Sequence, residues 1–365
     1  MRNTDFPAWP AEACSRVYTD QPTVWRYVRD AGPVVLLNER RMFTAAEDVA
    51  AVFASRALRR VDYPTAESAG DADEPYELSD VGRDLLAQAM NPRAARGWAA
   101  QFRAPGAYLF DIIAGRGGCE AVSEVIAPAT AVMAWILLGA KEPQLFREGG
   151  AFNLRAAITA RRSALGGDLV SRLIRLAPQL TDEEVYHLAA RCARPLPTIG
   201  QVFGVALFEL GRDPVLARAL RGNRDAIRVF VEEAVRLSPA RETTRIALAD
   251  TRIGDVDVPA GEHIEVSISA ANREAAGGDN FNEGVRRHWG FGAGRHRCLA
   301  NHAARSLLCV ALETWLDRIP EFRVPAGFVP TFRPPQQGTW FEELPLTWSR
   351  PTRLLSPQLD SEQPV

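Results

Sequence analysis

The strongest constraint on this chain is a glycine-rich loop that presents one cysteine immediately before a helix-forming segment. The loop is FGAGRHRCLA, residues 291–300, and the helix-forming segment NHAARSLLCVALETWLDRI follows it. Gly292 and Gly294 permit a turn and a close approach of the backbone that a Cβ atom would obstruct. The amides after Cys298 lie at the predicted N-terminus of the helix, where the backbone favours a thiolate. The pattern therefore predicts that Cys298 is presented to a metal.

This loop resembles the haem loop of the cytochrome P450 family, Phe-Gly-x-Gly-x-His-x-Cys-x-Gly, and only Ala300 departs from that pattern. The resemblance implies the P450 fold, mainly α with small β-sheets (α+β). In that fold the cofactor, heme b (iron protoporphyrin IX), lies between a long distal helix and the proximal cysteine loop and helix. The resemblance also implies that Cys298 is the proximal iron ligand, a thiolate that favours O–O cleavage. Phe291, Gly292 and His296 are the other cofactor-binding positions of the loop.

An isolated cysteine is more often a small buried apolar residue than a ligand. That alternative stays open for Cys298, although the phenylalanine, glycines and histidine at fixed offsets argue against it. We adopt it for the other four cysteines, Cys14, Cys119, Cys192 and Cys309. Five scattered cysteines without paired spacing also favour a reducing, cytoplasmic location over a disulfide framework.

Length, charge and the N-terminal sequence limit the class of protein and the number of domains. Residues 1–25 contain no apolar run long enough for a signal peptide or a membrane anchor, which predicts a soluble, bacterial-type P450 with no membrane partner. The formal net charge of −2 argues against nucleic acid as a partner. The 365 residues can bury a substantial core, and no repeat or linker separates two cores. We therefore predict a single domain over residues 1–350 and a disordered tail at 351–365.

Hydrophobic periodicity predicts a helix-rich chain with a few strands. The predicted strands lie within residues 34–44 and around the turn at 259–261, and the predicted helices lie within 44–55, 78–139, 180–211 and 225–237. Thr181 is a good cap for the block that begins at 180, because acids follow it in the first turn. Residues 61–75 carry Pro, Gly and Asp and predict a loop.

The region that covers the pocket in P450s is short in this chain. Only residues 141–167 separate the helix that ends at Gly139 from the next helical segment, DLVSRLI. The family usually fits two lid helices into this region. The resemblance therefore implies a shortened lid.

Glu233 and Arg236 stand three residues apart, so they share one helix face and can pair. On a protein surface such a pair would contribute little to stability. In P450s a Glu-x-x-Arg helix precedes the cysteine loop and pairs with a residue from the segment just before the haem peptide. His288 matches that third partner. We interpret the trio as structural and not catalytic.

Haem carries two propionates, and burying them requires cations or hydrogen-bond donors. Three residues stand where the family places such groups: Arg83, Arg245 and His296. Each one alone could be solvated, but their joint placement favours contacts with haem. The family usually has a histidine four residues before the first arginine. This chain has Ser79, which implies that one contact is weakened or replaced by a shorter hydroxyl.

The distal helix departs most from the family. Aligned on the P450 pattern, Thr198 takes the place of the threonine that usually handles protons near bound oxygen, and Pro197 takes the place of the neighbouring acid. Pro195 and Pro197 predict a kink or an unwound turn. These prolines could do no more than bend the helix, but no carboxylate would remain at that point to relay protons.

Three charged residues bear on the substrate. Arg194 lies four residues before Thr198, and Arg194-Pro195 is similar to the Arg-Pro pair of the fatty-acid peroxygenase branch, where the arginine holds a substrate carboxylate. Arg241 and Glu242 lie in a segment that the family threads past the haem edge. They could pair with each other, bind a polar substrate or face solvent.

Together these features predict a P450 monooxygenase or oxidase that tailors a polar natural product or biosynthetic intermediate by hydroxylation or oxidative coupling. Thr198, Arg194 and Glu242 are the predicted catalytic residues, with substrate- or water-assisted proton delivery. The predicted partners are a small-molecule or carrier-bound substrate, ferredoxin and ferredoxin reductase. Two alternatives remain: a peroxide-driven P450 that uses Arg194-Pro195, and a degenerate P450-like module that recruits another enzyme. Retention of the predicted haem contacts argues against the second.

Overall fold

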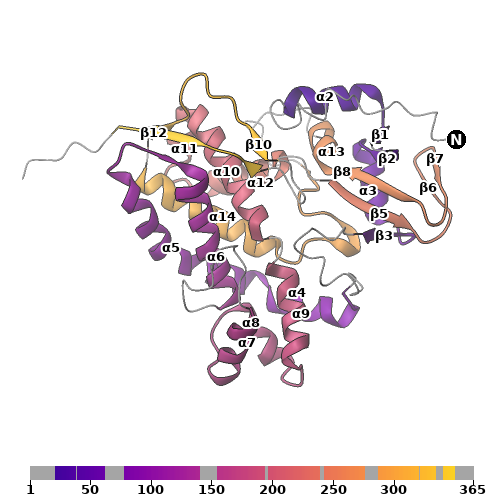
Figure 1. The fold of residues 1–365 in the computed structure, drawn as a ribbon, viewed down its shortest axis with the longest axis horizontal. Coiled ribbons are helices and arrows are strands. Elements are labelled where there is room, and N and C mark those ends of the chain that lie inside the picture. Colours follow the sequence, from indigo (N-terminus) through magenta and orange to yellow (C-terminus); the bar gives the residue numbers. More distant parts are fainter. Residues whose placement is uncertain are drawn as a thin grey trace, which may run out of the picture.

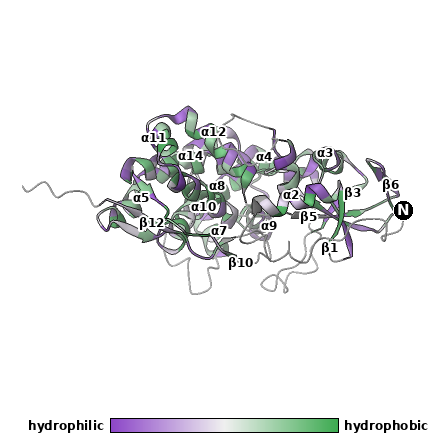
Figure 2. Cartoon of the chain, turned by 90° about the horizontal axis from the view of Figure 1, so that it is seen from above, coloured by the Kyte–Doolittle hydropathy of each residue, from purple (hydrophilic) through white to green (hydrophobic). Residues whose placement is uncertain are grey.

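The structure, a computed structural model, confirms a mainly α fold with small sheets (Figure 1). It describes residues 21–37, 39–61, 78–139, 154–193, 196–238, 242–275, 287–319, 321–333 and 340–349. The largest sheet lies at one end of the molecule beside three helices, and the other helices form a bundle at the opposite end (Figure 1). Along the helices hydrophobic and hydrophilic residues lie side by side, as expected of elements that each cover a core (Figure 2).

The largest sheet has five strands in the order β1-β2-β8-β5-β3. Its strands are β1 (Val34–Leu37), β2 (Arg40–Phe43), β3 (Leu58–Val61), β5 (Glu242–Ala247) and β8 (His263–Ser267). The helices beside it are α2 (Gln21–Ala31), α3 (Ala46–Ala54) and α13 (Ile268–Ala275). Strands from residues 34–61 thus join strands from residues 242–267. This pairing brings the end of α3 close to β5.

Three smaller sheets complete the strands. They are formed by β4 (Gly118–Glu120), β12 (Pro345–Trp348) and β9 (Phe322–Arg323), by β6 (Thr251–Ile253) and β7 (Val256–Val258), and by β10 (Phe332–Arg333) and β11 (Trp340–Phe341). The predicted turn at 259–261 lies between β7 and β8, so the strands predicted around it are confirmed.

The bundle is built around the helix that follows the cysteine loop, α14 (Asn301–Arg318), which packs against α5 (Pro92–Ala114). Trp315 of α14 is fully buried and meets the rings of Phe110 and Phe322 edge to face, with centroids 5.3 and 5.4 Å apart. The other helices are α4 (Asp80–Ala89), the π-helical turn η2 (Val122–Ile126), α6 (Ala127–Leu138), α7 (Leu154–Ser163), α8 (Leu169–Leu176), α9 (Asp182–Ala193), α10 (Leu196–Arg212), α11 (Pro214–Leu220) and α12 (Arg224–Leu237). Of the helices that the structure describes, none is long and apolar enough to cross a bilayer.

The predicted cap at Thr181 is confirmed. Its hydroxyl accepts a hydrogen bond from the Glu184 amide at 3.2 Å, and the Glu184 carboxylate accepts one from the Thr181 amide at 2.8 Å. The predicted helical block continues through α9 and α10, but residues 194–195 between them lie outside the described residues. The kink at Pro195 therefore stays a prediction.

Within the predicted lid region the described residues form one helix of ten residues, α7. Arg161 of α7 is buried, pairs with Asp168 at 2.7 Å and donates a hydrogen bond to the Gly139 carbonyl at 2.7 Å. This ion pair fixes α7 to the end of α6 and the start of α8. The shortened lid stays a prediction because residues 140–153 lie outside the described part, as do the predicted tail 351–365 and most of the predicted loop.

Candidate functional site

The cysteine loop lies between α13 and α14 and has the geometry that its glycines predict. Gly292 and Gly294 have φ angles of 63° and 61°, which side chains other than glycine rarely adopt. A Cβ on Gly294 would lie 2.1 Å from the Phe53 carbonyl oxygen, so only glycine fits against the end of α3. The Cys298 amide donates a hydrogen bond to the Phe291 carbonyl at 2.8 Å and closes the loop.

Cys298 is a half-buried thiol three residues before α14 begins. Its carbonyl accepts a hydrogen bond from Asn301 Nδ2 at 2.7 Å, which fixes the cysteine to the first residue of the helix. A cysteine just before a helix N-terminus lies where the helix dipole favours a thiolate. The geometry therefore suits Cys298 for the metal ligation that the sequence predicts.

Arg245 lies beside the loop and is almost fully buried. Its Nη1 donates to Thr243 Oγ1 at 2.7 Å and to the Thr244 carbonyl at 2.9 Å, which holds the guanidinium on one face of β5. Its Cζ lies 5.4 Å from the centre of the Phe53 ring. Because the Phe53 backbone touches Gly294, a buried cation is held next to the cysteine loop.

The other two predicted propionate contacts are Arg83, which lies on α4, and His296, which lies within the loop itself. Arg83 lies one turn after Asp80 on α4, and Asp80 pairs with Arg295 of the loop at 3.2 Å. His296 ends the 3₁₀ turn Gly294–His296 inside the loop. Arg83 thus lies on a helix that pairs with the loop, Arg245 packs against Phe53 beside the loop, and His296 lies within it. Their contacts with the haem propionates stay predictions.

Ser79 caps the helix that carries Arg83, and its predicted replacement of the family's histidine beside haem stays a prediction. Its hydroxyl accepts a hydrogen bond from the Gly82 amide at 3.1 Å and caps α4. The serine that takes the place of the family's histidine therefore starts the helix that carries Arg83.

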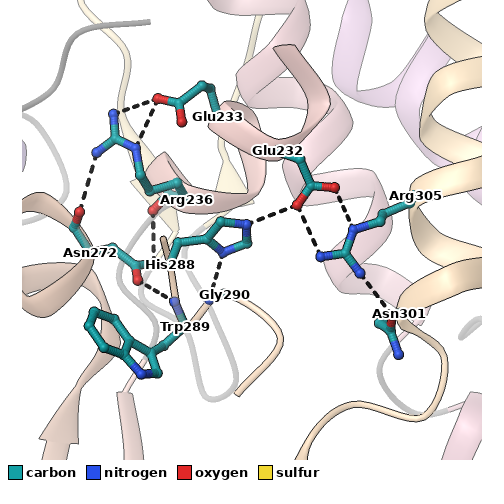
Figure 3. Close-up of polar contacts among 9 residues, drawn as sticks. All are labelled: Glu232, Glu233, Arg236, Asn272, His288, Trp289, Gly290, Asn301 and Arg305. Atoms are coloured by element: carbon teal, nitrogen blue, oxygen red, sulfur yellow. Dashed lines mark hydrogen bonds and ion pairs between the residues drawn. The ribbon is translucent and has the colours of Figure 1, made fainter. Parts of the chain in front are cut away.

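The Glu233–Arg236 pair is confirmed. Arg236 Nη2 and Nε lie 2.8 and 2.9 Å from Glu233 Oε2, and both side chains are at most 1% exposed (Figure 3). Arg236 Nη1 also donates to the Asn272 carbonyl at 3.4 Å. Asn272 links Arg236 to the segment before the cysteine loop. Its Nδ2 donates to the Arg236 carbonyl at 3.1 Å, and its Oδ1 accepts from the Trp289 amide at 2.6 Å.

The predicted partner of His288 was wrong. His288 Nε2 lies 2.9 Å from Glu232 Oε2, and Asn272 makes the link between Arg236 and the loop (Figure 3). Successive residues on a helix point about 100° apart, so Glu232 and Glu233 face different neighbours. Glu233 points toward α13, whereas Glu232 points toward the loop and α14 (Figure 3).

Glu232 and Arg305 were missed from the sequence. Arg305 Nη2 lies 3.0 Å from Glu232 Oε2, and its Nε makes a second contact with the same carboxylate. Burial by itself would raise the pKa of Glu232, but hydrogen bonds from His288 and Arg305 outweigh it and lower that pKa to about 2. The available signal was the Glu-Glu pair at 232–233, followed by an arginine two turns after Cys298.

Comparison with known proteins agrees with this geometry. No family model matches the chain. Cytochrome P450 105C1 from a Streptomyces species is 35% identical over 205 residues, which cover 53% of this chain and 54% of that protein. Cytochrome P450-SU2 from Streptomyces griseolus is 31% identical over 64% of this chain and 66% of its own length. The chain thus spans between about half and two thirds of these curated relatives.

Longer matches come from a third relative and from solved structures. Cyclomarin C epoxidase CymV from Salinispora arenicola is 27% identical over 79% of this chain and 84% of its own length. The crystal structure of P450BioI in complex with an acyl carrier protein covers 90% of this chain and 99% of that chain, with a TM-score of 0.77 and 22% identity. The chain belongs to the cytochrome P450 family. Members of this family are monooxygenases that bind heme b.

The residues around Cys298 in this P450 fit haem. Gly294 has no side chain, and a Cβ at this position would clash with Phe53, so the loop backbone can approach a flat group closely. The buried guanidinium of Arg245 lies beside the loop. Cys298 would hold the iron, while Arg83, Arg245 and His296 would hold the propionates. These donors match the charges of the cofactor, a cation at its centre and two anions at its edge.

The other cysteines that the structure describes are unsuited to bind the iron of this P450. Burial raises the pKa of Cys119, Cys192 and Cys309 to about 12 in each case, so they stay neutral thiols. Cys192 is buried, as predicted, and the other two are half-buried against the core. Cys14 lies outside the described residues.

Cys192 also locates the distal helix of the P450. Its Sγ lies 3.4 Å from Met90 Sδ, and Cys298 is among the groups whose charge acts on it. The last turn of α9 therefore lies near the cysteine loop. The only indication of this proximity in the sequence is the position of Cys192, six residues before Thr198.

The distal residues of the P450 are described only in part. Thr198 lies in the first turn of α10 and is half-buried, and Pro197 beside it is exposed. The backbone of Glu242 pairs with Ser267 at the start of β5. Arg194, Arg241 and the side chain of Glu242 lie outside the described residues, so their predicted roles stay predictions.

Proposed function

We propose that this protein is a haem-thiolate oxidase that tailors a polar natural product or biosynthetic intermediate by hydroxylation or oxidative coupling. The observation that carries the proposal is the cysteine loop itself, in which Cys298 lies just before α14 and beside the buried guanidinium of Arg245. Haem bound there would supply the activation of oxygen. The chain supplies the ligand, the cations for the propionates and the distal wall.

Proton delivery on the distal side is proposed to depend on Thr198 together with a group that the helix does not itself provide. Thr198 can orient a water, but Pro197 can neither accept nor donate a proton. The only carboxylate among the described residues of α10 is Glu209, three turns further along the helix. A substituent of the substrate, Glu242 or a chain of waters would therefore carry the proton, and Arg194 would fix an anionic group nearby.

The relatives support a role in natural-product tailoring. CymV is named as a cyclomarin C epoxidase, and the structural neighbour HmtN is described as a post-tailoring hydroxylase of himastatin biosynthesis. P450BioI was solved with a fatty acid carried on an acyl carrier protein. We extend these roles to this chain as proposals, with a small-molecule or carrier-bound substrate and electrons from ferredoxin and ferredoxin reductase. The neutral thiols at Cys119, Cys192 and Cys309 support a reducing, cytoplasmic location.

The carbon monoxide difference spectrum of the reduced protein tests the proposal. The wild type should show the red-shifted Soret band of a thiolate-ligated haem, and Cys298→Ala should abolish it. Cys309→Ala is the matched control, because this half-buried thiol lies on α14 itself and its pKa is raised by burial. A red-shifted band that survived in Cys298→Ala, or was absent from the wild type, would refute haem-thiolate chemistry at this site.

A further inference from the structure

We propose that Glu232 is the positioning residue for the thiolate, and that it holds both ends of the cysteine loop through His288 and Arg305 (Figure 3). The inference rests on the proposed haem-thiolate function. It assigns the positioning of the Cys298 thiolate to Glu232, the residue next to the Glu233–Arg236 pair. Glu232 lies on α12, and its carboxylate points at the loop and at α14 together (Figure 3).

The first connection runs from Glu232 to the start of the loop. His288 Nε2 lies 2.9 Å from the carboxylate, and His288 Nδ1 accepts a hydrogen bond from the Gly290 amide at 3.1 Å. Since Nδ1 accepts, Nε2 carries the proton that the carboxylate binds. A Cβ on Gly290 would lie 2.5 Å from Val235 Cγ1, so the loop begins in direct contact with α12.

The second connection runs from Glu232 to the end of the loop. The carboxylate holds the Arg305 guanidinium, whose Cζ lies 4.2 Å from the centre of the Phe291 ring. Arg305 Nη1 donates to Asn301 Oδ1 at 2.8 Å. Asn301 Nδ2 in turn donates to the Cys298 carbonyl at 2.7 Å.

Both backbone groups of Cys298 are therefore held by residues that Glu232 orders. The Cys298 amide donates to the carbonyl of Phe291, and Arg305 stacks on the ring of that phenylalanine. The Cys298 carbonyl accepts from Asn301, and Arg305 donates to the side chain of that asparagine. The guanidinium is partly exposed, with 28% of its side-chain area accessible, so it would turn toward water if the carboxylate were neutral. The sulfur would then lose a fixed position relative to the iron, and the thiolate bond would break more easily.

Glu313 offers a matched control on the helix that carries Arg305. It is ion-paired with Arg103 and lies 3.7 Å from Arg224, and its side chain is 12% exposed compared with 18% for Glu232. It lies eight residues after Arg305 on α14, about 12 Å further along the axis. Glu313→Gln therefore removes a comparable carboxylate charge without touching the loop.

The test measures how fast the red-shifted Soret band of the reduced, CO-bound protein decays to the band of haem without thiolate. Decay is followed at one temperature below the unfolding transitions of wild type, Glu232→Gln and Glu313→Gln. We expect Glu232→Gln to decay about tenfold faster than wild type, equivalent to about 1.4 kcal/mol, and Glu313→Gln to stay within about twofold. Thermal midpoints of the haem-bound proteins should fall by similar amounts in the two variants.

Equal decay rates in the two variants would overturn the inference and leave the haem-thiolate function standing. A wild type without the red-shifted band would instead defeat the proposed function, and the inference with it. Arg305→Lys carries the test if Glu232→Gln fails to load haem. A lysine keeps the charge beside Glu232 but lacks the flat guanidinium that stacks on Phe291 while it donates to Asn301. A decay rate in Arg305→Lys equal to that of the wild type would likewise refute the inference.

Discussion

The proximal and distal sides of this P450 use charge in opposite ways. On the proximal side Glu232, Glu233 and Arg236 are buried or half-buried, and each has an ionic or hydrogen-bonded partner in the described structure. On the distal side the first three turns of α10 are largely apolar, with Thr198 and Gln201 as their polar side chains. Among the described residues, paired charges therefore surround the cysteine loop, whereas the first three turns of α10 carry no charged side chain.

The contrast follows from what each side must do. A buried charge is tolerated only when it is paired, and a loop that places a ligand gains accuracy from such pairs. An apolar distal wall does not compete with a substrate for its hydrogen bonds. Four predictions test this contrast, in order of falling effect.

Removing one member of the fully buried pair should have the largest effect on stability. Glu233→Ala leaves the Arg236 guanidinium without its carboxylate at a site with no measurable exposure, which should cost about 3–5 kcal/mol. Urea unfolding of the haem-bound protein measures the loss. Glu313→Ala, at a partly exposed pair, should cost clearly less. A Glu233→Ala protein of wild-type stability would break the claim that the proximal charges are structural.

The Glu233–Arg236 pair and the glycine loop could be predicted because local geometry determines them. A spacing of three residues puts two side chains on one helix face, and positive φ angles require glycine. The partner of His288 could not be predicted in this way. The choice between Glu232 and Glu233 depends on the rotation of α12 against α13 and α14, which the packing of the whole bundle sets.

Contacts between segments that are distant in the chain could not be predicted from the sequence either. Cys192 and Met90 lie 102 residues apart in the chain, and only the fold brings their sulfurs to 3.4 Å. Ser79 is an intermediate case. A serine directly before Asp80 is typical of a helix cap, so the cap could be predicted from local sequence alone.

Acid should weaken the proximal side through Glu232. Its pKa in the folded protein is about 2, below the ordinary value of 4.5, so the charged form stabilises the fold. This contribution is present above about pH 4.5 and is lost as the pH falls toward 2. The difference in free energy of unfolding between wild type and Glu232→Gln should therefore shrink between about pH 5 and pH 2, as urea titrations would measure. A difference that stayed constant would show that the carboxylate is not held by His288 and Arg305.

On the distal side substitution should change coupling and leave the fold intact. Thr198→Ala removes the hydroxyl proposed to orient a water, so more reducing equivalents should end as hydrogen peroxide, by a few-fold per electron consumed. Arg194→Ala should raise the substrate dissociation constant, by about tenfold if a charged hydrogen bond is lost. Peroxide release and substrate titrations measure these effects, and thermal unfolding should stay close to that of the wild type. Unchanged coupling and unchanged binding would together show that the distal site lies elsewhere.

The smallest effect is expected at the rim of the loop, where Arg295 pairs with Asp80 at 3.2 Å. The two side chains are 57% and 83% exposed, and ion pairs in water contribute about 0.2–1 kcal/mol. Asp80→Asn should therefore lower stability by no more than about 0.5 kcal/mol and should leave the decay of the red-shifted Soret band within about twofold of the wild type. The pair touches the loop as directly as Arg305 does, but water screens it and it does not connect to the backbone of Cys298. If Asp80→Asn loosened the thiolate as strongly as Glu232→Gln, contact with the loop would suffice, and the distinction between the interior network and the exposed rim would fail.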